Sequence, residues 1–349
     1  MLRTVTLREK VGVVLLNLGG PNTLDDVEPF LYNLFSDRKI IRLGPAAFLQ
    51  KFIARRIARK RAPVSRESYR LIGGGSPLTR ITGEQGQALH QELAPRGDFR
   101  VAMAMRYWQP TAREALGQML EAGISRVVAL TLYPHYSVAT TGSSVDDLLA
   151  AATAAWPGRF EIAVVDSWPE QRDYVECLAQ SIRDGLAKFD GEEACLLYSA
   201  HSLPVDFIED GDPYVEEIEK TLRAVELLTG KPGVLCFQSR SGPVEWLEPS
   251  TPDMLKDAAE WGCRNVLLVP ISFVSDHVET LYEIDMLYRD QARALGMRLE
   301  RSESLNANPL FIKGLADLVL TACGEKGWLD CSGSDREPQN RRISDRRTA

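Results

Sequence analysis

The sequence predicts an α/β protein made of two similar Rossmann-like lobes, each a four-stranded parallel sheet flanked by helices, with an active-site cleft between the lobes. Apolar runs alternate with amphipathic segments throughout both halves of the chain. The segments LEAGISRVVALTLYPHYS and AAEWGCRNVLLVPISFVSDH also share one plan, in which a helix ends at glycine and a strand and a polar loop follow. The chain has 349 residues and 44% hydrophobic content, which is enough for two domains.

The predicted strands are apolar runs that stop at turn residues, as expected of strands buried on both faces of a parallel sheet. In the first half they cover residues 11–18, 99–105, 127–132 and 161–165. In the second half they cover residues 194–198, 233–237, 266–271 and 297–301. We therefore expect a first lobe over 1–167, a second over 168–304, a helix over 305–323 that packs back on the first lobe, and a polar, mobile tail over 324–349.

The connections between the strands carry further signals. Gly19, Gly20 and Pro21 end the first strand and start a helix near residues 22–26, but the G-x-G-x-x-G spacing of a dinucleotide site is missing. Three glycines at 73–75 indicate a tight turn without the lysine of a phosphate-binding loop, and a helix over 79–93 follows.

Residues 45–62 form a basic amphipathic helix in this interpretation. Its apolar side chains recur at helical spacing and include Phe48, Phe52 and Ile53, while arginines and lysines occupy its other sides. Two interpretations stay open, namely a surface helix packed on the core and a helix that contacts a membrane surface or an acidic ligand.

Composition excludes several classes of protein. A net charge of -7 and a pI near 5.4 argue against a nucleic-acid binder. No uninterrupted apolar segment approaches the roughly 20 residues of a membrane span, and charges interrupt the N-terminus where a signal peptide has its core. We expect a cytoplasmic protein. Its cysteines have no Cys-x-x-Cys pair and are expected to be reduced and buried: they are Cys177, Cys195, Cys236, Cys263, Cys323 and Cys331.

An acidic stripe follows the strand at 266–271. At about 100° per residue, Asp276, Glu279 and Glu283 share one face of a helix that begins where this strand ends. A solvated helix face is the alternative. Because ligands of open α/β sheets bind beyond the carboxyl ends of the strands, the stripe is a candidate site.

Three histidines, His135, His201 and His277, also follow predicted strand ends. Neutral imidazole with carboxylates binds borderline divalent metals such as Fe(II), Co(II) or Zn(II), and the same groups accept protons near neutral pH. Ser199 and Ser202 flank His201, but neither lies in the G-x-S-x-G elbow of a hydrolase. Acyl hydrolysis is therefore the weaker alternative.

Eight segments, in chain order, resemble the ferrochelatase family, whose members catalyse the terminal step of haem synthesis. They are LLNLGGP (15–21), IGGGSP (72–77), MRYW (105–108), LYPHYS with TTGSS (132–144), SAHSLP (199–204), FQSRSGPVEWLEP (237–249), SDHVETLYEID (275–285) and LNANPLFI (305–312). The resemblance implies the chelatase fold and the insertion of Fe(II) into protoporphyrin IX, with release of two protons, to give protohaem.

The resemblance also implies residue roles. It assigns catalysis and metal binding to His201 and Glu279. It places a proton or metal relay at Asp276, His277 and Glu283. Six residues would line the porphyrin site, namely Leu18, Ser76, Arg106, Tyr107, Tyr133 and Trp246.

Departures from the family pattern refine these expectations. Val138 stands where some relatives that carry a two-iron, two-sulfur cluster have a cysteine, and Cys323 and Cys331 are too few and wrongly spaced for one. We therefore expect no iron-sulfur cluster, no tightly bound cofactor, and Fe(II) as a substrate. The NLGGP turn favours protoporphyrin IX over coproporphyrin. A coproporphyrin or other tetrapyrrole chelatase, or a non-catalytic tetrapyrrole or metal-binding protein, remains the alternative, and the oligomeric state is open.

Overall fold

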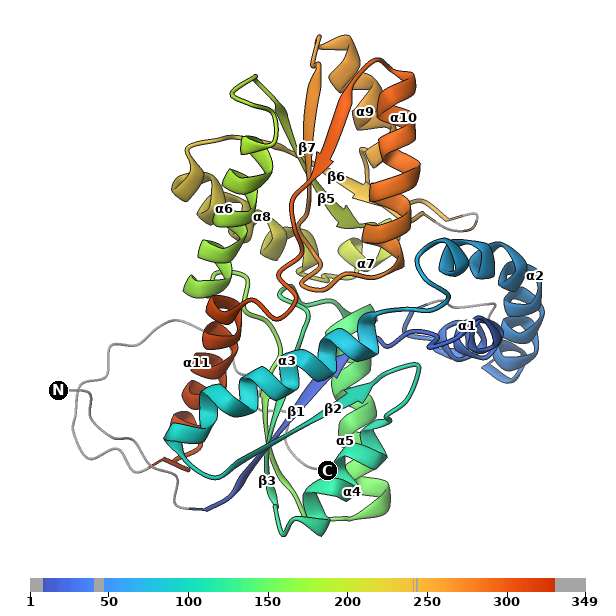
Figure 1. Cartoon of the computed structure of the whole chain (residues 1–349). Coiled ribbons are helices and arrows are strands. Elements are labelled where there is room, and N and C mark those ends of the chain that lie inside the picture. Colours follow the sequence, from blue (N-terminus) through green and yellow to red (C-terminus); the bar gives the residue numbers. More distant parts are fainter. Residues whose placement is uncertain (1–8, 41–46, 241, 243, 330–349) are drawn as a thin grey trace, which may run out of the picture.

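Two four-stranded parallel sheets organise the chain, which confirms the predicted fold class (Figure 1). The computed structural model describes residues 9–40, 47–240, 242 and 244–329. The first sheet has the order β2-β1-β3-β4 and the second the order β6-β5-β7-β8, so the chain follows the same path twice. The strands of the first sheet are β1 (Val11–Asn17), β2 (Phe99–Met105), β3 (Arg126–Thr131) and β4 (Glu161–Val165). Those of the second sheet are β5 (Cys195–His201), β6 (Val234–Gln238), β7 (Asn265–Pro270) and β8 (Arg298–Arg301).

Strand β5 is longer than predicted. It continues beyond Tyr198 to His201, which pairs with Gln238 of β6. Polar Ser199 stays inside this buried strand because its hydroxyl donates to Oε1 of Gln238 at 2.6 Å and lies 2.8 Å from the hydroxyl of Thr251. His201 is therefore the last residue of a strand and not part of the loop that follows it.

Helices cover both faces of the first sheet. Helices α4 (Ala112–Glu121) and α5 (Ser143–Ala155) pack on one face, with Val14 and Leu16 of β1. Helices α3 (Leu78–Leu93) and α11 (Pro309–Glu325) pack on the other face, with Val13 and Leu15. Because side chains alternate along a strand, the continuous apolar run of β1 supplies both cores.

The second sheet is covered in the same way (Figure 1). Helices α6 (Arg172–Ala187) and α8 (Tyr214–Thr229) lie on one face. Helix α9 (Thr251–Glu260), the π-helix η5 (Glu279–Tyr288) and α10 (Arg289–Ala294) lie on the other. The shorter pieces are the 3-10 turns η1 (Leu24–Asp26), η2 (Ala47–Leu49) and η3 (Ala94–Arg96), the π-helix η4 (Val138–Gly142) and the helix α7 (Val205–Glu209).

The C-terminal helix α11 contacts α3 of the first lobe and also α6 of the second, so it packs on both lobes and not on the first alone. The Trp168 ring meets Tyr174 edge-on at 4.9 Å and lies 5.9 Å from Phe311 of α11. The chain stays folded beyond residue 324, where a polar tail was expected, because Trp328 and Leu329 are buried. Residues 330–349 lie outside the described part of the chain.

Helices α1 (Val27–Ser36) and α2 (Gln50–Leu71) pack against each other beside the first sheet (Figure 1). Helix α2 runs well past residue 62, its predicted end, and its buried stripe consists mainly of alanines. The small alanine side chains of α2 let it approach α1 closely. The larger apolar residues of α2 therefore need not supply the face that packs on α1. The predicted apolar face is correspondingly exposed, with Phe48 82% and Phe52 70% accessible. Among the described helices, none is both long and apolar enough to span a bilayer.

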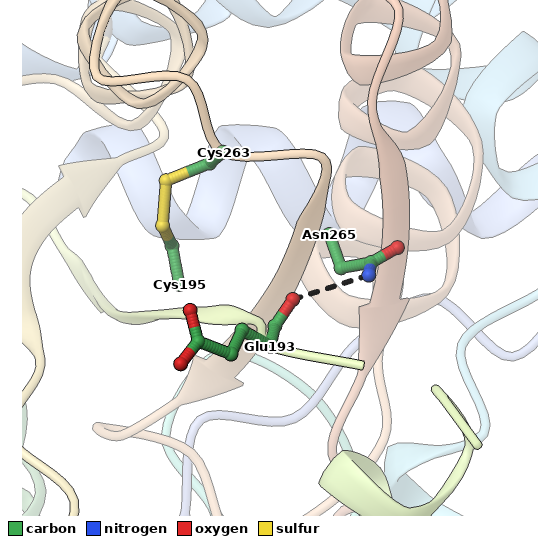
Figure 2. The surroundings of a disulfide bond; sticks show 4 residues. All are labelled: Glu193, Cys195, Cys263 and Asn265. Atoms are coloured by element: carbon green, nitrogen blue, oxygen red, sulfur yellow. Dashed lines mark hydrogen bonds between the residues drawn. A yellow bond between two sulfur atoms is a disulfide. The ribbon is translucent and has the colours of Figure 1, made fainter. Parts of the chain in front are cut away.

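The prediction that all cysteines are reduced is wrong for one pair. Cys195, at the start of β5, and Cys263, before β7, form a disulfide (Figure 2). The two strands are adjacent, and this brings the two Cα atoms to 6.2 Å, within the reach of a disulfide. The other described cysteines, Cys177, Cys236 and Cys323, are free and buried, as expected, and Cys331 lies outside the described residues.

Candidate functional site

His201 and Glu279 form the centre of the candidate site. His201 ends β5, and Glu279 begins η5, which follows β7. Nδ1 of His201 lies 2.8 Å from Oε2 of Glu279. The strand order of the second sheet reverses between β5 and β7, so this pair lies at the switch point where ligands of open α/β sheets bind.

The electrostatics of this pair favour charge on both partners. Burial would lower the pKa of His201, but the charge of Glu279 and its hydrogen bond outweigh burial and raise that pKa above its usual value. Burial would raise the pKa of Glu279, but the charge and hydrogen bond of His201 bring it well below its usual value. Since Nδ1 is committed to Glu279, Nε2 is the ring nitrogen available to a proton or a metal ion. The His201 side chain is 37% exposed and can be reached from solvent.

His277 lies on the other side of Glu279, with its Nε2 4.0 Å from Oε1 of that carboxylate. Its Nδ1 lies 3.0 Å from the carbonyl oxygen of Ser275, which can only accept, so the proton sits on Nδ1. Burial lowers the pKa of His277 below its usual value. Phe273 contacts both imidazoles, at 4.3 Å from His277 and edge-on at 6.3 Å from His201. Sequence reasoning did not single out Phe273.

Ser239 joins Glu279 to Glu283. Its hydroxyl lies 2.8 Å from Oε2 of Glu279 and 2.6 Å from Oε2 of Glu283. One hydroxyl proton cannot serve two carboxylates, so one of these carboxyl groups must carry a proton for both contacts to be hydrogen bonds. Burial, and then the charge of Glu279, raise the pKa of Glu283 to about 7, which makes Glu283 the proton carrier. Ser239 has a φ of 68°, a strained value for a residue other than glycine.

Asp276 has different partners from the other two carboxylates. Its oxygens accept from Arg301 at 3.1 Å, from Asn306 at 2.9 Å and from Ser304 at 2.8 Å. Burial would raise its pKa, but these partners lower it below the usual value. The predicted row of three carboxylates is therefore incomplete, because the chain from β7 is not helical at Asp276 and continues into a π-helix with a different periodicity.

Arg106 and Tyr107, two candidate porphyrin contacts, converge on Asp37, which the sequence did not indicate. Arg106 Nη2 and Tyr107 OH each donate to Oδ2 of Asp37 at 2.8 Å, and the Ser143 hydroxyl donates to it at 2.5 Å. Arg106 is 22% exposed, and Tyr107 is buried. A ligand carboxylate would therefore meet an arginine that already has an acidic partner.

Of the remaining candidates, Leu18 and Tyr133 lie just after strands, Trp246 lies between β6 and α9, and Ser76 lies between α2 and α3. Leu18 follows β1 and accepts from the Tyr107 N–H at 3.0 Å, and Tyr133 follows β3 with its hydroxyl 3.4 Å from that of Ser144. Trp246 forms an isolated bridge with Pro204, three residues after His201. Ser76 precedes α3; its N–H donates to the carbonyl of Pro21 at 2.7 Å.

Val278 connects the two groups of candidates. It directly precedes Glu279 and packs on the hydrophobic cluster that contains Tyr107, on which Leu18 also packs. The structure therefore places the histidine–carboxylate pair of the second lobe next to a surface of the first lobe. We call this surface, which includes Leu18, Arg106 and Tyr107, the first-lobe wall. Among the residues that the structure describes, no group of three or more His, Cys, Asp or Glu side chains could hold a metal ion.

Comparison with known proteins relates most of the chain to one family. The family model described as Ferrochelatase matches residues 10–323. The chain is 57% identical to the ferrochelatase of Desulfotalea psychrophila over 312 residues, which cover 88% of this chain and 96% of that protein. It is 53% identical to the ferrochelatase of Geotalea uraniireducens, over 89% of this chain and 97% of that protein.

A solved structure described as SirB from Bacillus subtilis with Fe3+ is similar in fold, with a TM-score of 0.55 and 11% identity over 91% of this chain and 98% of that one. At this low identity the similarity concerns the fold alone.

Proposed function

The chain belongs to the ferrochelatase family, and on this basis we propose that it inserts Fe(II) into protoporphyrin IX and releases two protons, the last step of haem synthesis. Ferrochelatase activity, that of a lyase, follows from the family, and the choice of protoporphyrin IX is our proposal. The observation that carries the proposal of metal insertion at this site is the hydrogen bond of 2.8 Å between Nδ1 of His201 and Oε2 of Glu279. This pair supplies the base and the weak metal ligand that the reaction requires.

Metalation removes two pyrrole N–H protons and brings in one divalent ion. In our proposal, Nε2 of His201 faces the macrocycle and accepts a proton or holds the metal, and Glu279 balances the resulting charge. Glu283, which Ser239 connects to Glu279, then passes protons toward solvent. His277 adds a neutral imidazole beside Glu279. A single histidine with a carboxylate binds a divalent ion weakly enough to release it into the ring.

The test of this proposal is the metalation rate of site variants. Purified protein is mixed with protoporphyrin IX and Fe(II) or Zn(II), and the loss of porphyrin fluorescence is followed. We expect His201→Ala and Glu279→Gln to slow metalation by about 10²-fold or more, because each removes a proton-transfer group. His90→Ala is the matched control, since His90 is exposed on α3, and it should keep the normal rate. Normal rates in both site variants would overturn the assignment.

The choice of porphyrin is supported by the apolar character of the first-lobe wall. Leu18 offers a hydrocarbon surface, and the guanidinium of Arg106 is already paired with Asp37. Coproporphyrin carries four propionates and protoporphyrin two, so a wall with so little free positive charge suits the latter. A higher kcat/KM for coproporphyrin than for protoporphyrin would replace the proposed substrate and leave the reaction unchanged.

We also propose that the protein is cytoplasmic and contacts membranes peripherally through residues 45–62. Of this segment, residues 45 and 46 lie outside the described part of the chain. Phe48 and Phe52 are exposed beside exposed cations such as Arg55 and Arg56, which would favour anionic lipid. Vesicle flotation with and without anionic lipid tests this. The double variant Phe48→Ser/Phe52→Ser should no longer float, while Leu227→Ser, at an exposed leucine of α8, should behave as wild type.

Finally, we propose that Fe(II) is a substrate, that no iron-sulfur cluster is bound, and that no other cofactor is tightly held. The support is the cysteine pattern, since Cys177, Cys236 and Cys323 are buried singly and Cys195 is bonded to Cys263. Metal analysis and absorption spectra of protein purified without oxygen test it. Stoichiometric iron with inorganic sulfide would contradict this proposal.

A further inference from the structure

The start of helix α8 in the second lobe holds the polar loop between β3 and η4 in the first lobe. Oδ2 of Asp212 accepts from the Ser137 hydroxyl at 2.9 Å and from the Val138 N–H at 2.8 Å. Glu217 accepts from the Tyr136 N–H at 2.7 Å. These contacts join residues 74 to 81 positions apart in the chain.

Asp212 is the most fully bonded carboxylate of this group. Its side chain is buried, with the residue 8% exposed, and its other oxygen, Oδ1, accepts from the Tyr214 N–H at 3.1 Å. Ser137, which donates to Asp212, also accepts from the Ala139 N–H at 3.1 Å and so caps η4. One carboxylate therefore fixes the start of η4 and the first turn of α8 together.

Both ends of this connection lead to the candidate site. The Tyr214 hydroxyl donates to the carbonyl oxygen of His201 at 3.0 Å. On the other side, η4 runs directly into Ser143, whose hydroxyl donates to Asp37 and accepts from the Arg106 guanidinium at 2.7 Å. Hydrogen bonds, joined by the short chain segment of η4 and by Tyr214 itself, thus link His201 in the second lobe to the wall built by the first.

We propose that Asp212 is a positioning residue that holds His201 at a fixed distance from the first-lobe wall. Together with Ser137, Val138 and Tyr214, it forms what we call the Asp212 clamp. This inference rests on the proposed function, because the distance matters if a rigid macrocycle bound to that wall must present its nitrogens to His201. A misplacement of about 1 Å costs such a reaction on the order of 10²-fold in rate.

The Asp212→Asn variant breaks the clamp with little change of shape. An amide has one oxygen, so its NH2 group must oppose either the Val138 N–H or the Tyr214 N–H, whichever way it is turned. We expect kcat to fall about 10-fold or more, while the KM for porphyrin stays within about 3-fold, because the first-lobe wall still binds the ring. Asp210→Asn, at an exposed carboxylate two positions away, is the matched control and should keep both constants.

A double-mutant cycle separates positioning from a general loss of stability. Tyr214→Phe removes the hydroxyl that hydrogen-bonds to His201 and to Ser272, while its ring still packs edge-on against His135 at 6.3 Å. If Asp212 acts on His201 through Tyr214, the double variant Asp212→Asn/Tyr214→Phe should be no slower than Tyr214→Phe alone, because Asp212 has no further effect once the Tyr214 hydroxyl is gone. Losses in kcat that simply multiply, or a normal kcat in both single variants, would overturn the proposal. Tyr214→Phe decides the question if Asp212→Asn does not fold, since a normal kcat in it excludes the link.

Hydrogen exchange gives a readout that does not depend on activity. Asp212→Asn should speed amide exchange relative to wild type and to Asp210→Asn, either at 136–142 or in the first turn of α8, depending on which N–H the NH2 group opposes. Unchanged exchange at both places would refute the clamp even in an inactive protein. If wild type itself fails to metalate any porphyrin, the proposed function fails, and the exchange result still tests the clamp separately.

Discussion

Replacing Glu283 by glutamine should make the protein more stable at alkaline pH and less active. Burial and the charge of Glu279 raise the pKa of Glu283 from 4.5 to about 7 in the folded protein. The folded state therefore binds a proton more tightly than the unfolded state, and stability falls as the pH rises from about 4.5 to about 7. The difference between these two pKa values corresponds to a destabilisation of up to about 3 kcal/mol above pH 7.

Glutamine cannot ionise, so Glu283→Gln escapes this penalty while keeping the shape of the side chain. Urea unfolding followed by circular dichroism should show similar stability for variant and wild type near pH 5. Near pH 8.5 the variant should be more stable by up to about 3 kcal/mol. Metalation should slow, since the group that shares Ser239 with Glu279 can no longer release or take up a proton.

Glu260→Gln is the control for this experiment, because Glu260 is exposed at the end of α9. Glu260→Gln should change the free energy of unfolding by the same small amount at pH 5 and at pH 8.5. A Glu283→Gln variant whose stability relative to wild type is the same at pH 5 and pH 8.5 would refute the reasoning. So would a variant that is less stable than wild type at the higher pH.

Three other substitutions test features of the fold. Replacing Cys195 and Cys263 by serine should lower the free energy of unfolding by about 4 kcal/mol in the chain-entropy model, since the disulfide closes a loop over a sequence separation of 68. Wild type measured in reductant should lose the same amount of stability. An unchanged free energy of unfolding would show that the disulfide does not form. Arg301→Met should cost about 3–5 kcal/mol in urea unfolding, because it leaves the largely buried Asp276 without its cation and leaves Asp285 with only Arg289, 3.8 Å away; a loss below about 1 kcal/mol would contradict that. Gly75→Ala should cost about 1–3 kcal/mol, because a Cβ there would lie 2.2 Å from the backbone oxygen of Asn22; a fully stable variant would show that this turn can move.

The amino-acid sequence alone determined the strands, because a strand buried on both faces must be continuously apolar and must stop at turn residues. It also indicated His201 and Glu279, since each follows a predicted strand and belongs to a recognisable motif. Local signals were misleading where they assumed one geometry. A period of about 100° per residue assumes a helix that already includes Asp276, but the chain is not helical there and the π-helix η5 begins only at Glu279, so Asp276 was grouped with carboxylates whose partners it does not share.

Contacts between distant segments were decided only by the tertiary structure. Asp37 and Arg106 are 69 positions apart, and Ser239 and Glu279 are 40 apart. No periodicity relates such pairs, because periodicity reports which face of one element is buried and not which other element covers it. The disulfide is a further case, since the neighbouring strands β5 and β7 bring Cys195 and Cys263 together. The sequence thus determined the helices and strands and indicated His201 and Glu279. The tertiary arrangement of the strands and the connections between them determined which residues these two contact.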